Sequence, residues 1–501
     1  MFYLGIDAGT TCIKAAIVSD EGTYIDTAVE DVTLFMPSED ACELDMLLLW
    51  ENLCRLLRTL SKRNPAIWSK LAGIGITGQG DGLWAIDSEG NPVRNAILWN
   101  DTRTKHLKLE NKDKIDGICI RNNANPLYAG SNIHILRWMK ENEPDQLSRI
   151  RKIFHCKDWL NYKLTGIVCS DDSDMTTALM NLKSGTFSKE ILDALELSPF
   201  LELFATPKAS TEVIGSVTGD AAEQTGLKKG LPVIAGAIDV AAVAVGLGAV
   251  DTGDTCIIAG TTLANQTIIE ENDIDFSKGL ILSHIPKNRF VCTMPTLSGA
   301  AAIDWVKKLF YPTLTFEELE QIVNQVPIGS RGVIYHPYLQ GERAPFRNPF
   351  AAGSFFGLKS THGKEEFMRA AFEGIAMSLR DCFDSLPQTK DRIFISGGAS
   401  KNDTFCQMAA DSLGKTIVRK QGKEAGIKGI VSVVKVALGH QQELYSMEQS
   451  IDNMEQSIEK EFLPDADRQE KYQEVFRLFQ SLRYDYEKHW LQRNNLFKEN
   501  L

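Results

Sequence analysis

Short apolar runs alternate with longer helical patterns along the chain, as is typical of an α/β protein. Two apolar runs near the N-terminus, at 2–7 and 13–18, flank a Gly-Thr-Thr turn and predict a β-hairpin. Leucines and a tryptophan recur at helical spacing over 46–61, which predicts a helix there. Further apolar runs that end near turn residues predict strands at 73–77, 83–87, 232–237 and 392–395.

The second half of the chain repeats the opening pattern. A strand, a second Gly-Thr-Thr turn and another strand are expected over 255–269. The small apolar residues of 240–250 predict a tightly packed helix, and glycines cluster at 246–254. Because 501 residues exceed what one hydrophobic core organises, we predict two domains, 1–248 and 249–501. The second should end in a charged, helix-rich tail from about 440, and without a low-complexity linker the two should pack around a central cleft.

Composition narrows the class of protein. The chain is 43% hydrophobic and 24% charged, which is ordinary for a globular protein. A net charge of −12 argues against nucleic-acid and anionic-membrane partners, and no apolar run approaches the ~18–20 residues of a membrane span. The chain opens with a core strand rather than an apolar leader, so we expect no signal peptide. Ten scattered cysteines without a C-x-x-C pair favour a reducing cytoplasm over a disulfide or metal framework.

The two Gly-Thr-Thr turns are candidate phosphate-binding sites. Glycine lets the backbone approach a ligand, and turn N–H groups and threonine hydroxyls donate to phosphate oxygens. The first turn lacks the P-loop spacing and precedes a strand rather than a helix, which excludes that nucleotide-binding design. Asp7, just before this turn, is a candidate Mg²⁺ ligand. Taken alone, the first turn is equally consistent with an ordinary hairpin.

Asp239 and the loop 78–82 are candidates for chemistry on a hydroxyl. Asp239 follows a buried strand and precedes the small-residue helix, where it could accept a hydroxyl proton or cap the helix. The loop Gly78-Gln79-Gly80-Asp81-Gly82 offers backbone, amide and carboxylate groups suited to a polyol, with a flexible turn as the alternative.

Two further loops have structural alternatives. Gly397-Gly398 follows the strand at 392–395 and could let a base or ribose lie against the backbone, or could simply begin a helix. For Arg343, within 337–345, we favour a structural pair with Glu342.

Taken together, these segments resemble the FGGY carbohydrate kinases, which are ATP-dependent kinases of sugars and polyols. The matching segments occur in the family's order and cover roughly residues 2–430, and the stretch 353–373 is similar to the family's second signature. The matching segments are 5–11, 78–82, 96–104, 157–166, 236–239, 260–262, 338–345, 353–358, 369–374, 397–398 and 402. The resemblance implies two ribonuclease-H-like, actin-like ATPase domains with ATP and a sugar meeting in the cleft.

The resemblance also implies roles for individual residues. Asp239 would be the catalytic base in contact with the acceptor, which is the sugar or polyol that receives the phosphoryl group. Asp7 would position Mg²⁺. The residues implied on the acceptor side are Gln79, Gly80 and Asp81. The residues implied around ATP are Asp7, Thr10, Thr11, Lys14, Gly260, Thr261, Asp304, Gly398 and Asn402.

Departures from the family pattern leave the acceptor open. Glycerol kinases carry Arg-Glu, and D-xylulose kinases usually carry Met-His, where this chain has Gly80-Asp81. Ile135 replaces a lysine of the family's first signature. We expect transfer of the γ-phosphate of MgATP to a ketopentose, xylulose-like, or a short polyol. Erythritol, ribulose, gluconate and glycerol are alternatives, as is an actin- or chaperone-like switch that would not need Asp239. A homodimer is a candidate assembly.

Overall fold

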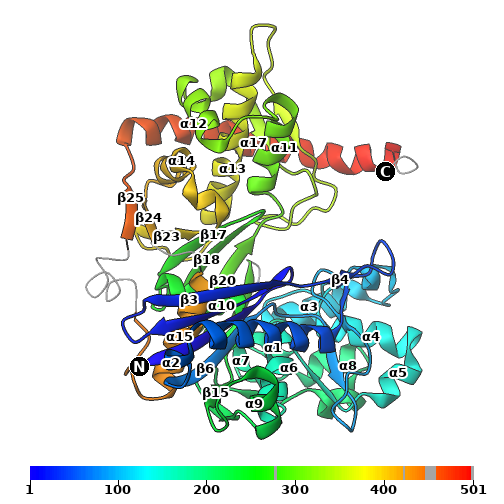
Figure 1. Ribbon diagram of the computed structural model, residues 1–501. Coiled ribbons are helices and arrows are strands. Elements are labelled where there is room, and N and C mark those ends of the chain that lie inside the picture. Colours follow the sequence, from blue (N-terminus) through cyan, green and yellow to red (C-terminus); the bar gives the residue numbers. More distant parts are fainter. Residues whose placement is uncertain (276–278, 421–423, 446–457, 498–501) are drawn as a thin grey trace.

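The molecule is built on two seven-stranded sheets, which lie one above the other in Figure 1. The computed structural model describes residues 1–275, 279–420, 424–445 and 458–497. The first sheet contains β1 (Phe2–Ala8), β2 (Cys12–Ser19), β3 (Tyr24–Asp31), β6 (Leu71–Gly78), β14 (Val213–Ser216), β15 (Pro232–Ile234) and β16 (Ala237–Ile238). The second contains β17 (Thr255–Ala259), β18 (Leu263–Ile269), β19 (Leu280–Ser283), β20 (Phe290–Pro295), β23 (Arg392–Ser396), β24 (Thr416–Lys420) and β25 (Ile458–Phe462).

Helices cover both sheets and extend the first half sideways (Figure 1). Those of the first half are α1 (Met46–Arg63), α2 (Pro65–Trp68), α3 (Lys112–Asn123), α4 (Asn132–Asn142), α5 (Pro144–Arg149), α6 (Cys156–Thr165), α7 (Asp172–Met175), α8 (Lys189–Ala194), α9 (Gly219–Thr225) and α10 (Asp239–Leu247). Those of the second half are α11 (Ala300–Phe310), α12 (Phe316–Gln325), α13 (Lys364–Phe383), α14 (Asp403–Leu413), α15 (Ala425–Ala437) and α17 (Ala466–Phe497). Among the described helices, none has both the length and the apolar character that a membrane span requires.

Short strands pair outside the two main sheets. They are β4 (Leu34–Phe35), β5 (Glu43–Leu44) and β8 (Ala96–Ile97) in one sheet, and the pairs β7 (Trp84–Ile86) with β9 (Lys152–Phe154), β10 (Ser170–Asp171) with β13 (Pro207–Lys208), β11 (Met180–Asn181) with β12 (Thr186–Phe187), and β21 (Ile334–His336) with β22 (Ser354–Phe356). The strand predicted at 83–87 is therefore present as β7 but lies away from the main sheets. Trp84 on this strand is fully buried, so it belongs to the core.

The predicted hairpin and the helix that covers it are both present. Strands β1 and β2 pair antiparallel, with Asp7 opposite Lys14. Asp45 caps α1 by accepting hydrogen bonds from the N–H groups of Leu47 and Leu48, at 2.8 and 3.1 Å. Five leucines of α1 point into the first core, and the helix ends at Arg63, two residues before a proline. The five leucines are Leu49, Leu53, Leu56, Leu57 and Leu60.

Helices α10 and α15 cross between the two sheets (Figure 1). Helix α10 comes from the first half but packs largely on the second sheet, whereas α15 comes from the second half and packs on the first sheet. Their backbones touch at two glycines. A Cβ on Gly429 would lie 1.8 Å from the carbonyl oxygen of Ala242, and one on Gly246 would lie 1.9 Å from that of Ala425. The 240–250 pattern predicted the helix, but not that its neighbour comes from residues 425–437.

Two other expectations differ from the structure. The strand predicted at 232–237 is divided into β15 and β16, because Gly236 has a φ of 77° and its Cα lies against the carbonyl group of Ile76. The tail from 440 contains the edge strand β25 before the long helix α17. Part of that predicted tail, 446–457 and 498–501, lies outside the described residues.

Candidate functional site

Three parallel strands bring the predicted acidic residues to one edge of the first sheet. Thr77 of β6 lies beside Asp7 of β1 on one side and beside Ala237 of β16 on the other. The loop 78–82 and Asp239 follow directly after these strand ends. The carboxyl ends of parallel strands are a common place for ligand sites in α/β sheets.

Asp239 is the first residue of α10, and its Oδ1 accepts the N–H of Val240 at 2.7 Å. Burial, with the charge of Asp7 and smaller contributions from Asp174 and Asp81, raises the pKa of Asp239 to about 7. A carboxylate with a pKa near neutrality can accept a proton and release it again at physiological pH.

Asp7 carries a charge that the protein only partly balances. Burial raises its pKa to about 6, Lys14 opposes the increase, and Glu424 adds to it. Lys14 is itself ion-paired with Glu424 at 2.9 Å. No hydrogen bond to the Asp7 carboxylate comes from any residue that the structure describes. An oxygen ligand with uncompensated charge fits a hard divalent cation such as Mg²⁺.

The first Gly-Thr-Thr turn is hydrogen-bonded to the loop 78–82, which we call the acceptor loop after its predicted role. Thr10 donates through Oγ1 to the Oε1 of Gln79 at 3.1 Å, and the indole N–H of Trp99 donates to Thr10 at 3.0 Å. Thr11 is exposed at the tip of the turn. Trp99 lies within a segment that matches the family, but no local pattern indicates that its ring reaches this turn.

The acceptor loop is held by two residues that sequence analysis missed. Asp81 adopts a φ of 55°, and its Oδ1 accepts hydrogen bonds from the hydroxyl groups of Tyr128, at 2.6 Å, and Thr177, at 2.7 Å. Burial raises the pKa of Asp81, while these two donors and His155 oppose the increase.

Gly80 lies against residues from two other elements. A Cβ at this position would lie 2.1 Å from the Cδ1 of Ile238 and 2.7 Å from the Oδ1 of Asp174. The loop therefore excludes a side chain at residue 80 unless both neighbours move.

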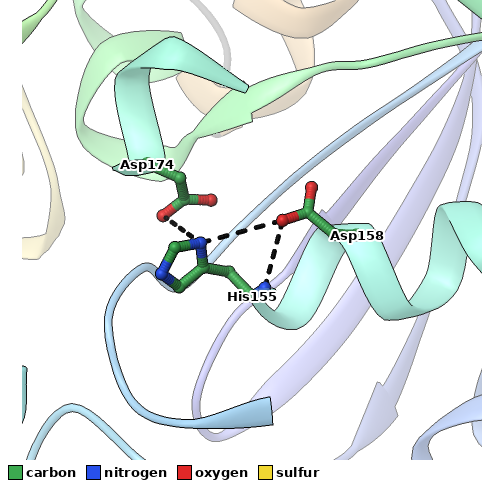
Figure 2. Close-up of side chains that lie close together, drawn as sticks. All are labelled: His155, Asp158 and Asp174. Carbon is green, nitrogen blue, oxygen red and sulfur yellow. Dashed lines mark hydrogen bonds and ion pairs between the residues drawn. The ribbon is translucent and has the colours of Figure 1, made fainter. Parts of the chain in front are cut away.

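A buried ionic cluster lies behind this loop. Figure 2 shows the ring of His155 between Asp158 and Asp174, with its Nδ1 3.7 and 3.8 Å from their nearest oxygens. The ammonium group of Lys157, which is not drawn, lies 2.6 Å from Asp158 and 2.8 Å from both Asp171 and Asp174. Although burial alone would lower the pKa of Lys157, the three carboxylates hold it well above its ordinary value.

A histidine and two aspartates of this cluster lie close enough together to suggest a metal site, but these aspartates already have a cation as their partner. The Lys157 ammonium already supplies the positive charge that a metal ion would bring. The cluster connects to the strand before Asp239 through Ser173. Its hydroxyl donates to Asp171 at 2.6 Å and accepts the N–H of Ile238 at 3.0 Å.

The second Gly-Thr-Thr turn lies at the corresponding edge of the second sheet. The first residues of α11 bind this turn, because the N–H groups of Ala300 and Ala301 donate to the carbonyl oxygens of Gly260 and Thr261 at 3.1 and 3.2 Å. Asp304 lies one helical turn further along α11 and is half-buried.

The Gly397-Gly398 turn packs beside the second Gly-Thr-Thr turn, because β23 runs parallel to β17. A Cβ on Gly397 would lie 2.5 Å from the carbonyl oxygen of Ala259, whereas one on Gly398 would face open space. The side-chain oxygen of Asn402 accepts the N–H of Phe405 at 2.8 Å and so caps α14. Within the described ranges, no hydrogen bond or ion pair joins Gly260, Thr261 or Gly398 to Asp239 or the acceptor loop.

The predicted pair between Arg343 and Glu342 is wrong. The Glu342 carboxylate accepts the N–H groups of Leu297 and Arg343, at 2.6 and 2.9 Å, and the hydroxyl of Ser298 at 2.9 Å. The Nε of Arg343 donates to the carbonyl oxygen of Pro295 at 2.9 Å. Backbone groups therefore compete successfully for both side chains.

Comparison with protein families decides the class of this site. The family model described as FGGY family of carbohydrate kinases, N-terminal domain, matches residues 2–246, and the C-terminal domain of the same family matches 256–438. The chain belongs to the FGGY family of carbohydrate kinases. This FGGY kinase is therefore a sugar phosphotransferase, and the predicted family and two-domain, actin-like ATPase fold are confirmed.

Relatives and solved structures resemble the kinase over nearly its whole length. A xylulose kinase from Bacillus subtilis (strain 168) is 28% identical, covering 96% of each chain. The structure of a ligand-bound xylulose kinase from Lactobacillus acidophilus has a TM-score of 0.89 at 26% identity and covers 97% of this chain and 98% of its own. A gluconate kinase from the same organism has the same TM-score and coverage at 25% identity. The division at residue 248 and the roles of the site residues stay predictions.

Proposed function

We propose that this FGGY kinase transfers the γ-phosphoryl group of MgATP to a hydroxyl group of a ketopentose, xylulose-like, or of a short polyol. The observation that carries the proposal is the placement of Asp239 at the start of α10, where burial and nearby carboxylates raise its pKa to about 7. Phosphoryl transfer to a hydroxyl requires a positioned carboxylate that accepts the hydroxyl proton. The name of the Bacillus xylulose kinase supports a ketopentose acceptor.

On the acceptor side, the chain binds and orients the hydroxyl compound. Gln79, the backbone at Gly80 and the carboxylate of Asp81 form the loop beside Asp239, and Asp239 accepts the proton as the hydroxyl oxygen attacks. Asp7 and the surrounding turn would hold Mg²⁺. When bound, that ion would offset charge on the phosphate oxygens.

On the nucleotide side, exposed backbone and hydroxyl groups would bind ATP. We assign the phosphates to Thr10, Thr11, Gly260 and Thr261, with Lys14 held nearby by Glu424. The nucleoside would lie toward the open face of Gly398, where a Cβ would meet nothing within 4 Å. Asp304 and Asn402 flank these turns on α11 and at the start of α14. A cytoplasmic location and a homodimer stay predictions.

The proposal predicts ADP release that depends on an acceptor. Purified kinase with MgATP should release ADP at least about 100-fold faster with its acceptor than with water alone, because positioning and base catalysis act only on a bound hydroxyl. The measurement is coupled ADP release with D-xylulose, L-xylulose, ribulose, erythritol, glycerol and gluconate. Equal rates with and without every acceptor would contradict the proposal.

A pH dependence follows from Asp239. Because the base must be ionised, kcat/KM for the acceptor should fall about tenfold per pH unit on the acidic side of a midpoint near 7. Asp81→Asn should move this midpoint downward, since the charge of Asp81 helps to raise the pKa of Asp239. The test is a pH profile of kcat/KM for both proteins, and a flat profile between about pH 5.5 and 8 would argue against Asp239 as the base.

A further inference from the structure

Four buried carboxylates at and around the acceptor loop lie close enough together for the charges of three of them to act on the fourth, Asp239. They belong to Asp7, Asp81, Asp174 and Asp239. Burial raises the pKa of each of them, and Asp239 is raised further by the charges of the other three. Even where Mg²⁺ would balance Asp7 and Lys157 balances Asp174, the raised pKa values show that additional negative charge is disfavoured here, so a negatively charged ligand is disfavoured too.

The cations near these carboxylates are already engaged. Within the part of the chain that the structure describes, those that oppose the raised pKa values are Lys14, Lys157 and His155. Lys14 is ion-paired with Glu424, and Lys157 is fully buried among three aspartates. His155 lies between two carboxylates (Figure 2). None of them is left to bind an anionic group on an acceptor.

The geometry of Asp81 shows which kind of group it would bind. Tyr128 and Thr177 both donate to its Oδ1, and no described residue donates to its Oδ2. The two donors fix the carboxylate, so Oδ2 is presented as a strong hydrogen-bond acceptor. A hydroxyl group can donate to it, whereas the carboxylate of an aldonate would be repelled.

We propose that Asp81, held by Tyr128 and Thr177, makes the acceptor site selective for neutral polyols and ketoses and excludes aldonates. The inference rests on the proposed kinase function and narrows its substrate class. A xylulose kinase and a gluconate kinase share this fold equally well, so local residues, not the fold, must decide the charge of the acceptor.

Matched acceptor pairs test the selectivity. ADP release is measured with MgATP and either erythritol or erythronate, and either D-xylulose or D-xylonate. For each pair in which the kinase phosphorylates either compound, kcat/KM for the neutral compound should exceed kcat/KM for the acid by at least about 100-fold. The reason is that like charges at a desolvated site are strongly disfavoured. Equal or greater kcat/KM for the acids would overturn the inference and leave the kinase function intact. No acceleration by any acceptor would instead overturn the proposed function, and the inference with it.

Three variants separate the charge of Asp81 from its structural role. Asp81→Asn keeps the shape of the side chain but removes its charge. It should reduce the preference for the neutral compound at least about tenfold, mainly by raising the KM for the neutral compound. Tyr128→Phe keeps the charge, so it should lower kcat/KM but retain most of the preference. Asp485→Asn, an exposed carboxylate on α17, is the control and should change neither. Thermal unfolding verifies that each variant is folded. An unchanged preference in folded Asp81→Asn would overturn the inference.

Discussion

Replacing Asp239 by asparagine should lower kcat by about 10²–10⁴-fold while leaving the protein folded, because general-base catalysis typically contributes this much. Asparagine has nearly the same shape, and its side-chain oxygen can still accept the N–H of Val240 at the start of α10. It cannot take the proton of the attacking hydroxyl. The KM for the acceptor should change far less than kcat, since the change removes proton transfer rather than binding.

Coupled ADP release at saturating MgATP measures the effect, and circular dichroism verifies the fold. Asp485→Asn serves as the control, because this carboxylate is exposed and distant in sequence from every candidate site residue. The Asp239→Asn variant should also lose the acidic limb of the pH profile. Turnover within about threefold of the unmodified enzyme would remove Asp239 from the role of base.

The parts of the site that sequence could predict are those set by local pattern. Apolar runs that stop at Gly-Thr-Thr predicted both hairpins, β1–β2 and β17–β18. Asp7 and Asp239 could be placed because each lies at the end of a strand, and parallel pairing then brings those ends together. Strand ends are marked by residue type along the chain, so they can be recognised without knowing the fold.

Contacts between distant segments could not be predicted in this way. Tyr128 and Thr177 are 47 and 96 residues from Asp81, and their hydroxyls carry no local signal that they will meet its carboxylate. The Lys14–Glu424 pair joins residues 410 positions apart, because α15 returns from the second half to cover the first sheet. The acceptor loop was visible in the sequence, but the groups that fix its geometry follow from the complete fold.

The buried cluster around Lys157 was also hidden from the sequence, and it should be the most sensitive point for stability. Replacing Lys157 by methionine keeps much of the volume but leaves Asp158, Asp171 and Asp174 buried without their cation. Breaking a buried ionic network by removing one partner typically costs about 3–5 kcal/mol in the free energy of unfolding. The exposed pair Lys208–Glu212 offers a matched control, and Lys208→Met should cost less than about 1 kcal/mol.

The loss in Lys157→Met should grow with pH. Without the ammonium group, burial raises the pKa values of Asp158 and Asp174 above those in the unfolded chain, so the folded state binds more protons and loses stability as pH rises. Urea titrations at about pH 5.5 and 8, followed by tryptophan fluorescence, test this, since Trp84 and Trp159 are buried in the same half of the molecule. Because Ser173 links the cluster to the strand before Asp239, kcat should fall as well. A destabilisation below about 1 kcal/mol that is equal at both pH values would show that the three aspartates do not depend on Lys157.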